Sequence, residues 1–315
     1  MKKYKLTDEK IEWYGRTLYR IIALISFGDV KEGDLGGFIE KEENLSHYDN
    51  CWVCGKAQVY DEARVCGKAR VCGKAQVFGK AQVFGEARVY DEAQVYDEAR
   101  VYDEAQVFDE ARVCGKARVC GKARVCGEAH VCDEARVCGE AQVFGEAQVY
   151  DEARVYDEAQ VFDEAQVCGE ARVCGKARVY DEAQVCDEAR VCGEAQVFGE
   201  AQVYDEARVY DEAQVCDEAR VRGKARVCGE AQVCDEAQVY DEAQATTTVK
   251  TFGNRFRYNI TVTDKHIKIG CQQRLKSEWI NFTDREILEM DGRQALEFWN
   301  IFKPMGEKTG LFVEV

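Results

Sequence analysis

Between residues 57 and 242 the chain repeats one hexapeptide of alternating apolar and polar positions, Ala-x-Val-x-(Gly/Asp)-(Glu/Lys). The hexapeptide recurs 31 times in succession, with no insertion, deletion or proline. Ala and Val stand two positions apart, so in an extended segment they share one face and the residue between them points to the other. Six residues cannot enclose a core, so each repeat must bury its Ala and Val against its neighbours. The pattern predicts a β-solenoid.

Each hexapeptide also predicts a corner after its short strand. Gly adopts a positive φ at no steric cost, and an Asp side chain can hydrogen-bond to nearby backbone. The residue after Val is Phe or Tyr in 16 repeats, Cys in 14 and Arg222 in one. We expect the aromatic rings to stack on neighbouring coils and to be half-buried, with an exposed interaction surface as the alternative.

A longer period indicates how many hexapeptides make one coil. Residues 111–164 realign on residues 165–218 with few changes, which is a period of 54 residues. Duplication in whole coils of three hexapeptides keeps every face in register, whereas coils of four would not. We therefore predict a little over ten triangular coils, each of 18 residues.

An aliphatic residue is followed four positions later by a small one throughout the array, as in Val59 and Ala63 and in Val65 and Ala69. In this the chain resembles the hexapeptide-repeat left-handed β-helix superfamily. The resemblance implies an all-β fold, namely a left-handed parallel β-helix of triangular coils. Its left-handed connections would differ from the right-handed crossovers that parallel strands usually have. Residues 17–25, 27–39 and 42–45 resemble the N-terminal cap of repeat-rich YdcK-like proteins, which are common in phages and prophages.

The flanking segments predict a cap at each end of the solenoid, because a solenoid end exposes strand edges and core. We predict an N-terminal cap over residues 1–52, the β-helix over residues 53–245, and a small α+β cap over residues 246–315.

In the C-terminal cap, residues 256–263 and 266–270 read as a hairpin around Asp264 and Lys265. Thr283 and Glu286 form a capping box for a helix that Pro304 is expected to end. The apolar residues of this helix make the segment a candidate lid, oligomerisation unit or partner-binding head. The candidate oligomerisation residues are Leu296, Phe298, Trp299 and Phe302.

Charge and cysteine content narrow the environment and the partners. The array holds 40 acidic and 23 basic residues, so phosphates of a nucleic acid or a membrane surface would be repelled along it. The 17 cysteines are an odd number and alternate freely with Phe and Tyr, which favours free thiols in a reducing cytoplasm. That cytoplasm is the host's if a phage encodes the chain. Stacked cysteines, such as Cys120 above Cys138 and Cys174 above Cys192, could approach disulfide geometry. Residues 18–27 form the most apolar stretch and contain Arg20, so no signal peptide or membrane span is expected.

The residues between Ala and Val form outward rows when three hexapeptides make a coil. One row has arginine at nine of its ten positions and is a candidate ladder for binding carboxylates or other anions. The alternative is that these arginines only neutralise the acidic corners through weak surface ion pairs. A second row is mostly glutamine. The candidate ladder comprises Arg100, Arg118, Arg136, Arg154, Arg172, Arg190 and Arg208.

Catalytic signals are sparse. In the superfamily, acyltransferases use a histidine base, and γ-class carbonic anhydrases bind zinc through three histidines. The histidines of this chain lie far apart in the sequence, at His47, His130 and His266. His130 is a weak catalytic candidate at an ordinary outward position, and no cofactor or metal site is expected. The sequence favours a non-enzymatic, homo-oligomeric solenoid that scaffolds or binds a macromolecular partner. We expect this partner to be a protein, and a host protein if a phage encodes the chain. An acidic nucleic-acid mimic or nucleotide sponge, and an acyltransferase-like enzyme, stay open as alternatives.

Overall fold

The computed structural model describes residues 2–247, 249–252 and 257–313. Internal contacts divide the chain into two units, Met1–Asp181 and Glu182–Val315. None of the described helices combines the length and the apolar character that crossing a membrane requires.

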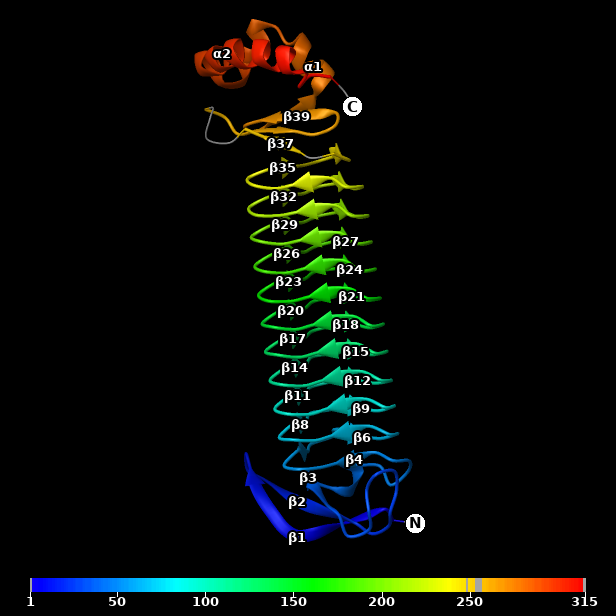
Figure 1. Ribbon diagram of the computed structural model, residues 1–315. Helices are drawn as coiled ribbons and strands as arrows, with labels where there is room; N and C mark the ends of the chain where they lie inside the picture. The colour runs from blue at the N-terminus through cyan, green and yellow to red at the C-terminus, as the bar shows by residue number, and fades with distance from the viewer. Residues whose placement is uncertain (1, 248, 253–256, 314–315) are drawn as a thin grey trace. The chain divides into compact units, whose positions relative to one another are not determined.

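The first unit begins with strands that extend one sheet of the solenoid. The hairpin of β1 (Tyr4–Trp13) and β2 (Arg16–Ala23) is antiparallel, and β2 pairs with β3 (Leu35–Ile39). Strand β3 then pairs in parallel with β5 (Gln58–Val59). Figure 1 shows β3 beside the first coils of the solenoid. A single-turn 3-10 helix covers Glu42–Asn44. The N-terminal segment thereby gives the first coil of the solenoid a paired neighbour.

The coils of the first unit are built from two-residue strands that begin every six residues and form three parallel sheets. The glutamine face comprises β5, β8 (Gln76–Val77), β11 (Gln94–Val95), β14 (Arg112–Val113), β17 (His130–Val131), β20 (Gln148–Val149) and β23 (Gln166–Val167). The arginine face comprises β6 (Arg64–Val65), β9 (Gln82–Val83), β12 (Arg100–Val101), β15 (Arg118–Val119), β18 (Arg136–Val137), β21 (Arg154–Val155) and β24 (Arg172–Val173). The third face comprises β4 (Trp52–Val53), β7 (Arg70–Val71), β10 (Arg88–Val89), β13 (Gln106–Val107), β16 (Arg124–Val125), β19 (Gln142–Val143), β22 (Gln160–Val161) and β25 (Arg178–Val179).

Paired residues of neighbouring coils are 18 positions apart, so the predicted coil length is confirmed. Arg118 pairs with Arg136, and its N–H donates to the carbonyl of Ala135 at 2.9 Å. The Ala and Val side chains of each hexapeptide point inward and form the core, and most of them are fully buried. The β-solenoid and its parallel sheets are confirmed.

The corners and the aromatic rows also follow the prediction. Asp103 and Gly121 occupy equivalent corners of successive coils with φ of 59° and 67°. The Gly121 N–H donates to Asp103 Oδ2 at 3.2 Å, so the aspartate hydrogen-bonds to the next coil. Phe84 and Tyr102 stack with ring centroids 5.0 Å apart and planes 2° from parallel. The rings are half-buried between coils, as expected.

The second unit starts with coils of the same kind and ends in a separate sheet with helices. Its coil strands are β26 (Gln184–Val185), β27 (Arg190–Val191), β28 (Gln196–Val197), β29 (Gln202–Val203), β30 (Arg208–Val209), β31 (Gln214–Val215), β32 (Arg220–Val221), β33 (Arg226–Val227), β34 (Gln232–Val233), β35 (Gln238–Val239) and β36 (Gln244–Ala245). The C-terminal elements, together called the C-terminal domain below, are β37 (Lys250–Thr251), β38 (Ile260–Val262), β39 (His266–Ile269), β40 (Gln272–Leu275), α1 (Lys276–Asn281) and α2 (Asp284–Thr309).

Polar contacts join the C-terminal sheet to the last coils of this unit. The Lys268 ammonium donates to Gln238 Oε1 at 2.7 Å and lies 3.4 Å from the centre of the Tyr240 ring. Asp264 accepts from the Thr246 N–H at 2.8 Å. These contacts place the sheet over the end of the solenoid, as Figure 1 shows.

The predicted hairpin is confirmed, but the predicted helix end is wrong. Strands β38 and β39 pair around Asp264 and Lys265, while Phe256, where the first strand was expected to begin, lies outside the described residues. Helix α2 continues past Pro304 to Thr309 and is capped by Gly310 with φ 71°. Phe302 and Gly306, on either side of the proline, are buried in the core, so packing outweighs the lost N–H donor.

The candidate oligomerisation residues lie mainly inside this unit. Phe298, Trp299 and Phe302 are buried in one cluster with Trp279 and Ile267, and Leu296 packs against that cluster. The interpretation of Phe298, Trp299 and Phe302 as a surface for a second copy is therefore corrected. Their spacing on the helix reflects the core of their own domain.

Candidate functional site

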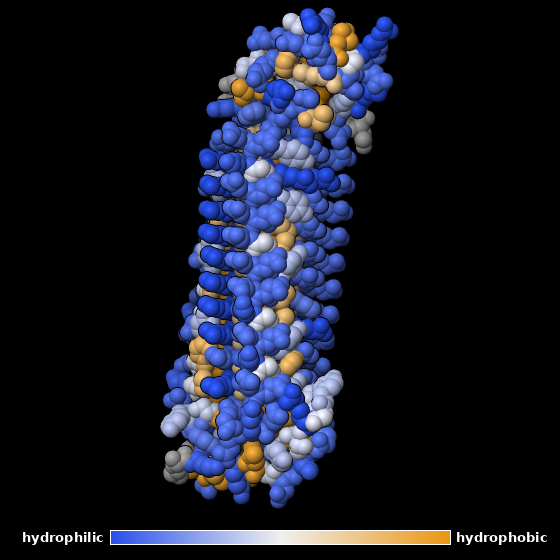
Figure 2. Space-filling view, turned by 180° about the vertical axis from the view of Figure 1, so that it is seen from behind, coloured by the Kyte–Doolittle hydropathy of each residue, from blue (hydrophilic) through white to orange (hydrophobic). Residues whose placement is uncertain are grey.

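The candidate ladder is a row of guanidinium groups on successive coils. In the first unit Arg100, Arg118, Arg136, Arg154 and Arg172 occupy equivalent positions of the arginine face, and each pairs in register with the next. Arg190 and Arg208 are paired in the same way in the second unit. Figure 2 shows hydrophilic side chains following one another from coil to coil in continuous rows.

In the part of the chain that the structure describes, the ladder arginines form no ion pairs. Among the described residues, no carboxylate oxygen lies within 4.0 Å of a guanidinium nitrogen of these seven side chains. Corner lysines behave differently, since Lys116 contacts Glu134 at 2.9 Å and Lys122 contacts Glu140 at 3.0 Å in the next coil. Several corner glutamates thus pair with lysine rather than with the ladder arginines, and the guanidinium groups stay available for another anion.

His130 lies on the glutamine face, between Arg112 and Gln148 in the register of the sheet. Partial burial, and then the nearby positive charge of Arg112, lower the pKa of the imidazole. The ring is therefore neutral at pH 7. His47 contacts Tyr4 near the N-terminus and His266 begins β39, so the structure does not bring the three histidines together.

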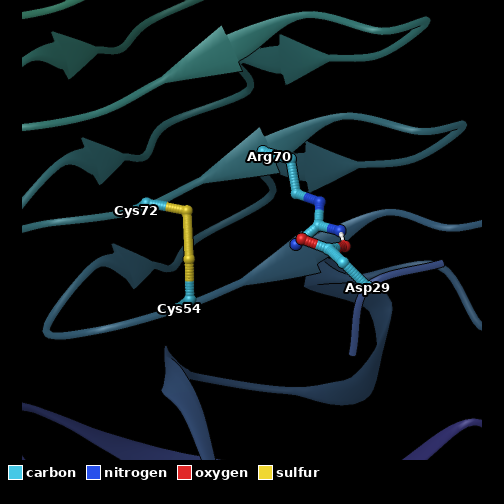
Figure 3. Close-up of a disulfide and its surroundings, with 4 residues drawn as sticks. All are labelled: Asp29, Cys54, Arg70 and Cys72. Carbon is cyan, nitrogen blue, oxygen red and sulfur yellow. Dashed lines mark ion pairs between the residues drawn. A yellow bond between two sulfur atoms is a disulfide. The ribbon is translucent and has the colours of Figure 1, made fainter. Parts of the chain in front are cut away.

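An open hollow of about 650 Å³ lies between the N-terminal segment and the third face. The Arg70 guanidinium in this hollow forms an ion pair with Asp29, next to the Cys54–Cys72 disulfide, as Figure 3 shows. At its rim Lys68 pairs with Glu86 at 2.7 Å. Burial and the neighbouring Arg88 lower the pKa of Arg70. Because two of its three cationic side chains, Lys68 and Arg70, pair with carboxylates of the same hollow, the hollow is a weaker anion site than the ladder.

The prediction of free thiols is wrong at several positions. Cys54 is bonded to Cys72 and Cys216 to Cys234, each across 18 residues with Cα atoms 4.6 Å apart. The register of the coils places stacked cysteines within the range of a disulfide. Asp217 lies beside the Cys216–Cys234 disulfide, and the three side chains are close enough to hold a metal ion. Both sulfur atoms are used by the disulfide, so they are not available as metal ligands. The further disulfide-bonded residues are Cys168, Cys174, Cys186 and Cys192.

Two other stacked cysteine pairs keep their thiols. The Cys138 thiol donates to the Cys120 sulfur, which lowers the pKa of Cys120 to about 6 despite its partial burial, and the Tyr102 hydroxyl adds a second hydrogen bond. Cys114, hydrogen-bonded to Cys132 and then Tyr96, has its pKa lowered to about 7. The thiolate of each pair is stabilised because its neighbours donate to it, so both pairs hold a nucleophile near neutral pH.

We expect Cys114 and Cys120 to react with iodoacetamide about fivefold faster than an ordinary cysteine at neutral pH, since their larger thiolate fraction outweighs the lower nucleophilicity of an acidic thiol. Their rates should fall as the pH drops through about 7 and about 6, because a lowered pKa keeps the thiolate only above that value. Intact-mass measurement of the non-reduced protein gives the number of fast sites.

Removing the donors tests the origin of this reactivity. The variant C132A/C138A should lose the fast phase, because Cys114 and Cys120 then lack their thiol donors. The control C126A should keep it, since burial raises the pKa of Cys126. A fast phase that persists in C132A/C138A contradicts the assignment.

No protein-family model matches the chain, and no curated protein is significantly similar to it. Among solved structures, it is similar to the UDP-N-acetylglucosamine O-acyltransferase of Moraxella catarrhalis, at 12% identity and a TM-score of 0.33, over 71% of this chain and 94% of that one. It is also similar to the Arabidopsis UDP-N-acetylglucosamine acyltransferase, at 10% identity and a TM-score of 0.34, over 79% and 89% of the two chains. Similarity at this level does not assign a family or an activity, so the β-solenoid assignment rests on the coils described above.

Proposed function

We propose that this chain is a non-enzymatic β-solenoid whose arginine face binds a carboxylate-rich segment of a protein partner. The observation that carries the proposal is the row of stacked guanidinium groups from Arg100 to Arg172. Within the described part of the chain they have no carboxylate within 4.0 Å, whereas the corner lysines Lys116 and Lys122 do. Guanidinium groups bind carboxylates through paired, charge-assisted hydrogen bonds, so a row of them suits an acidic polymer better than a single small anion.

The spacing of the row supports an extended acidic segment. Neighbouring parallel strands lie about 4.8 Å apart, whereas side chains on one face of an extended peptide repeat every ~6.7 Å. The long side chains of Arg and Glu can bridge this difference. Several contacts can then form along one segment, and each adds a modest increment of affinity.

The acidic background of the array limits this binding. With 40 acidic and 23 basic residues in the array, the long-range field repels an acidic partner, so attraction must come from contacts close to the guanidinium groups. Such contacts weaken as salt screens exposed charges, over about 8 Å at physiological ionic strength. We expect the affinity to fall on addition of salt.

A fluorescent peptide of alternating glutamate and serine is the probe that tests this proposal. Its binding is measured by fluorescence anisotropy at low and at physiological salt. The variant R100Q/R118Q/R136Q removes three adjacent guanidinium groups. It should bind the peptide at least about tenfold more weakly, because each lost contact costs roughly 0.5 kcal/mol or more.

The matched control is R88Q/R124Q/R178Q, which makes the same change of charge on the third face. Glutamines separate these three arginines from one another, because Gln106 pairs with both Arg88 and Arg124, and Gln160 pairs with Arg178. This variant should keep most of the affinity. No binding by the unmodified protein, or an equal loss in both variants, would refute the arginine face as the site.

A further inference from the structure

A second, unrelated hollow lies in the C-terminal part of the second unit. It has a volume of about 260 Å³, is open to solvent, and lies between the turn that joins β39 to β40 and the middle of α2. Its wall combines aromatic rings with one carboxylate, from Tyr258, Trp279, Phe298, Trp299 and Asp291, and Ile287 contributes an aliphatic side chain. The hollow differs from the solenoid faces because its lining comes from several elements of one packed core.

Helix α2 is broken where it borders this hollow. Asp291 has φ −153° and ψ 36°, and Gly292 has φ 65° and ψ −152°, so neither is helical. The conformation of Gly292 is one that glycine adopts almost alone. Built on Gly292, a Cβ atom would meet nothing within 4 Å, so local crowding does not account for the break. The break instead gives Asp291 a backbone direction that a continuous helix would not.

One oxygen of the Asp291 carboxylate accepts a hydrogen bond, and the other can accept one from a ligand. The Tyr258 hydroxyl donates to Asp291 Oδ2 at 2.6 Å. Oδ1 has no donor among the described residues. The nearby cation Arg257 is engaged with Gln294 rather than with this carboxylate. Burial, and then the hydrogen bond to Asp291, raise the pKa of Tyr258, so the hydroxyl stays protonated and continues to donate.

The aromatic side chains form a wall beside this carboxylate. The rings of Tyr258 and Phe298 meet edge to face with centroids 5.1 Å apart, and those of Trp279 and Trp299 lie 5.5 Å apart. Trp279 is held in place by its Nε1–H, which donates to the Ile267 carbonyl at 2.7 Å. The faces of aromatic rings carry partial negative charge and attract cations. A carboxylate beside such rings therefore selects a positively charged group and disfavours an anion.

We propose that this hollow binds a small organic ammonium ion. The ammonium group donates to Asp291 Oδ1 and lies against the aromatic rings, while the hydrocarbon part of the ligand occupies the space beside Ile287 and Ala295. The proposal does not depend on the arginine face, which binds the opposite charge on other elements. It makes the C-terminal domain a ligand-binding module as well as a cover for the last coil.

Three probes of one shape test the proposal on the full-length protein. They are phenethylammonium, the uncharged phenethyl alcohol and the anionic hydrocinnamate, titrated by calorimetry with tryptophan fluorescence as a second signal. The ammonium ion should bind about tenfold more tightly than the alcohol, because the alcohol forms neither the ion pair nor the cation–π contact, and hydrocinnamate should bind most weakly.

Two variants separate the charge from the hollow itself. Asp291→Asn should lower the affinity for phenethylammonium about tenfold and leave that for the alcohol unchanged, whereas Asp284→Asn, at the start of the same helix, should change neither. Ala295→Leu fills the hollow and should abolish the binding of both, with circular dichroism showing that the domain stays folded. The proposal is overturned by absent ammonium binding, by equal affinities for ammonium ion and alcohol, or by binding that survives Ala295→Leu.

Discussion

Replacement of Val149 by aspartate should unfold the coils around β20, whereas replacement of its neighbour Gln148 by aspartate should leave them folded. Val149 is fully buried and Gln148 is exposed, although they are consecutive residues of one two-residue strand. Aspartate at position 149 places an unpaired carboxylate in a core of Val and Ala. Burying an unpaired charge is among the few changes that cost about 4 kcal/mol or more.

Amide hydrogen exchange, followed coil by coil, measures this effect directly. A solenoid is stabilised by contacts between adjacent repeats, so protection should fall most in the coils next to position 149 and recover with distance. Gln148→Asp provides the matched control, with the same new side chain on the opposite face of the strand. Equal protection in the two variants would contradict the assignment of Val to the core and of the intervening position to solvent.

Phe302→Ala should destabilise the C-terminal domain by about 3–5 kcal/mol, the usual cost of removing a buried phenylalanine and leaving a cavity. Phe302 is fully buried and lies against Phe298, Trp299 and Phe312, with ring centroids 5.3, 6.1 and 6.0 Å away. Three aromatic side chains of one core therefore lose a common neighbour. The fluorescence of Trp279 and Trp299, which belong to the same cluster, reports the thermal transition of this domain.

Ile301 provides the control for this prediction because it precedes Phe302 on the helix and is 67% exposed. Ile301→Ala should shift the tryptophan transition little, since exposed substitutions usually change the stability by less than about 0.5 kcal/mol. If Ile301→Ala were as destabilising as Phe302→Ala, the helix would be using its outer face for a contact as large as its core. That result would reinstate α2 as a candidate for binding a second copy.

The sequence predicted the coils well because a solenoid repeats one local environment. Once Ala and Val share a face and Gly or Asp allows a positive φ, each hexapeptide repeats the backbone of the one before it. The 54-residue duplication then indicated which side chains stack, and the pairs Phe84–Tyr102 and Arg118–Arg136 occur as that register requires. Period, register and burial in the array are therefore local properties that the sequence alone carries.

The C-terminal domain was predicted only in part, because its packing joins residues distant in sequence. The hairpin and the capping box of Thr283 were visible as local patterns, and both are present. The passage of α2 through Pro304 and its break at Asp291 and Gly292 depend on what the helix packs against. Apolar spacing alone could not distinguish a helix face that contacts its own domain from one that contacts a second copy.

The candidate sites also differ in how far the sequence predicted them. The arginine row was readable from the sequence, but the choice between ion pairing and availability required side-chain positions. In these, corner glutamates such as Glu134 and Glu140 pair with lysine. Likewise, the period of 18 residues shows which cysteines stack but not whether each stacked pair is bonded as a disulfide or keeps its thiols. The hollow beside Asp291 had no sequence signal, since its lining combines residues of β-strands, a turn and two helices.

By itself, then, the sequence determined the β-solenoid, its 18-residue coils and the identity of its rows, because those follow from a short period and from the geometry of the strand. Only the tertiary structure decided which charges are paired, which thiols are bonded, where α2 breaks, and which of its aromatic residues lie in a core. These properties depend on distances between atoms that the chain brings together from far apart, and no local repeat specifies them.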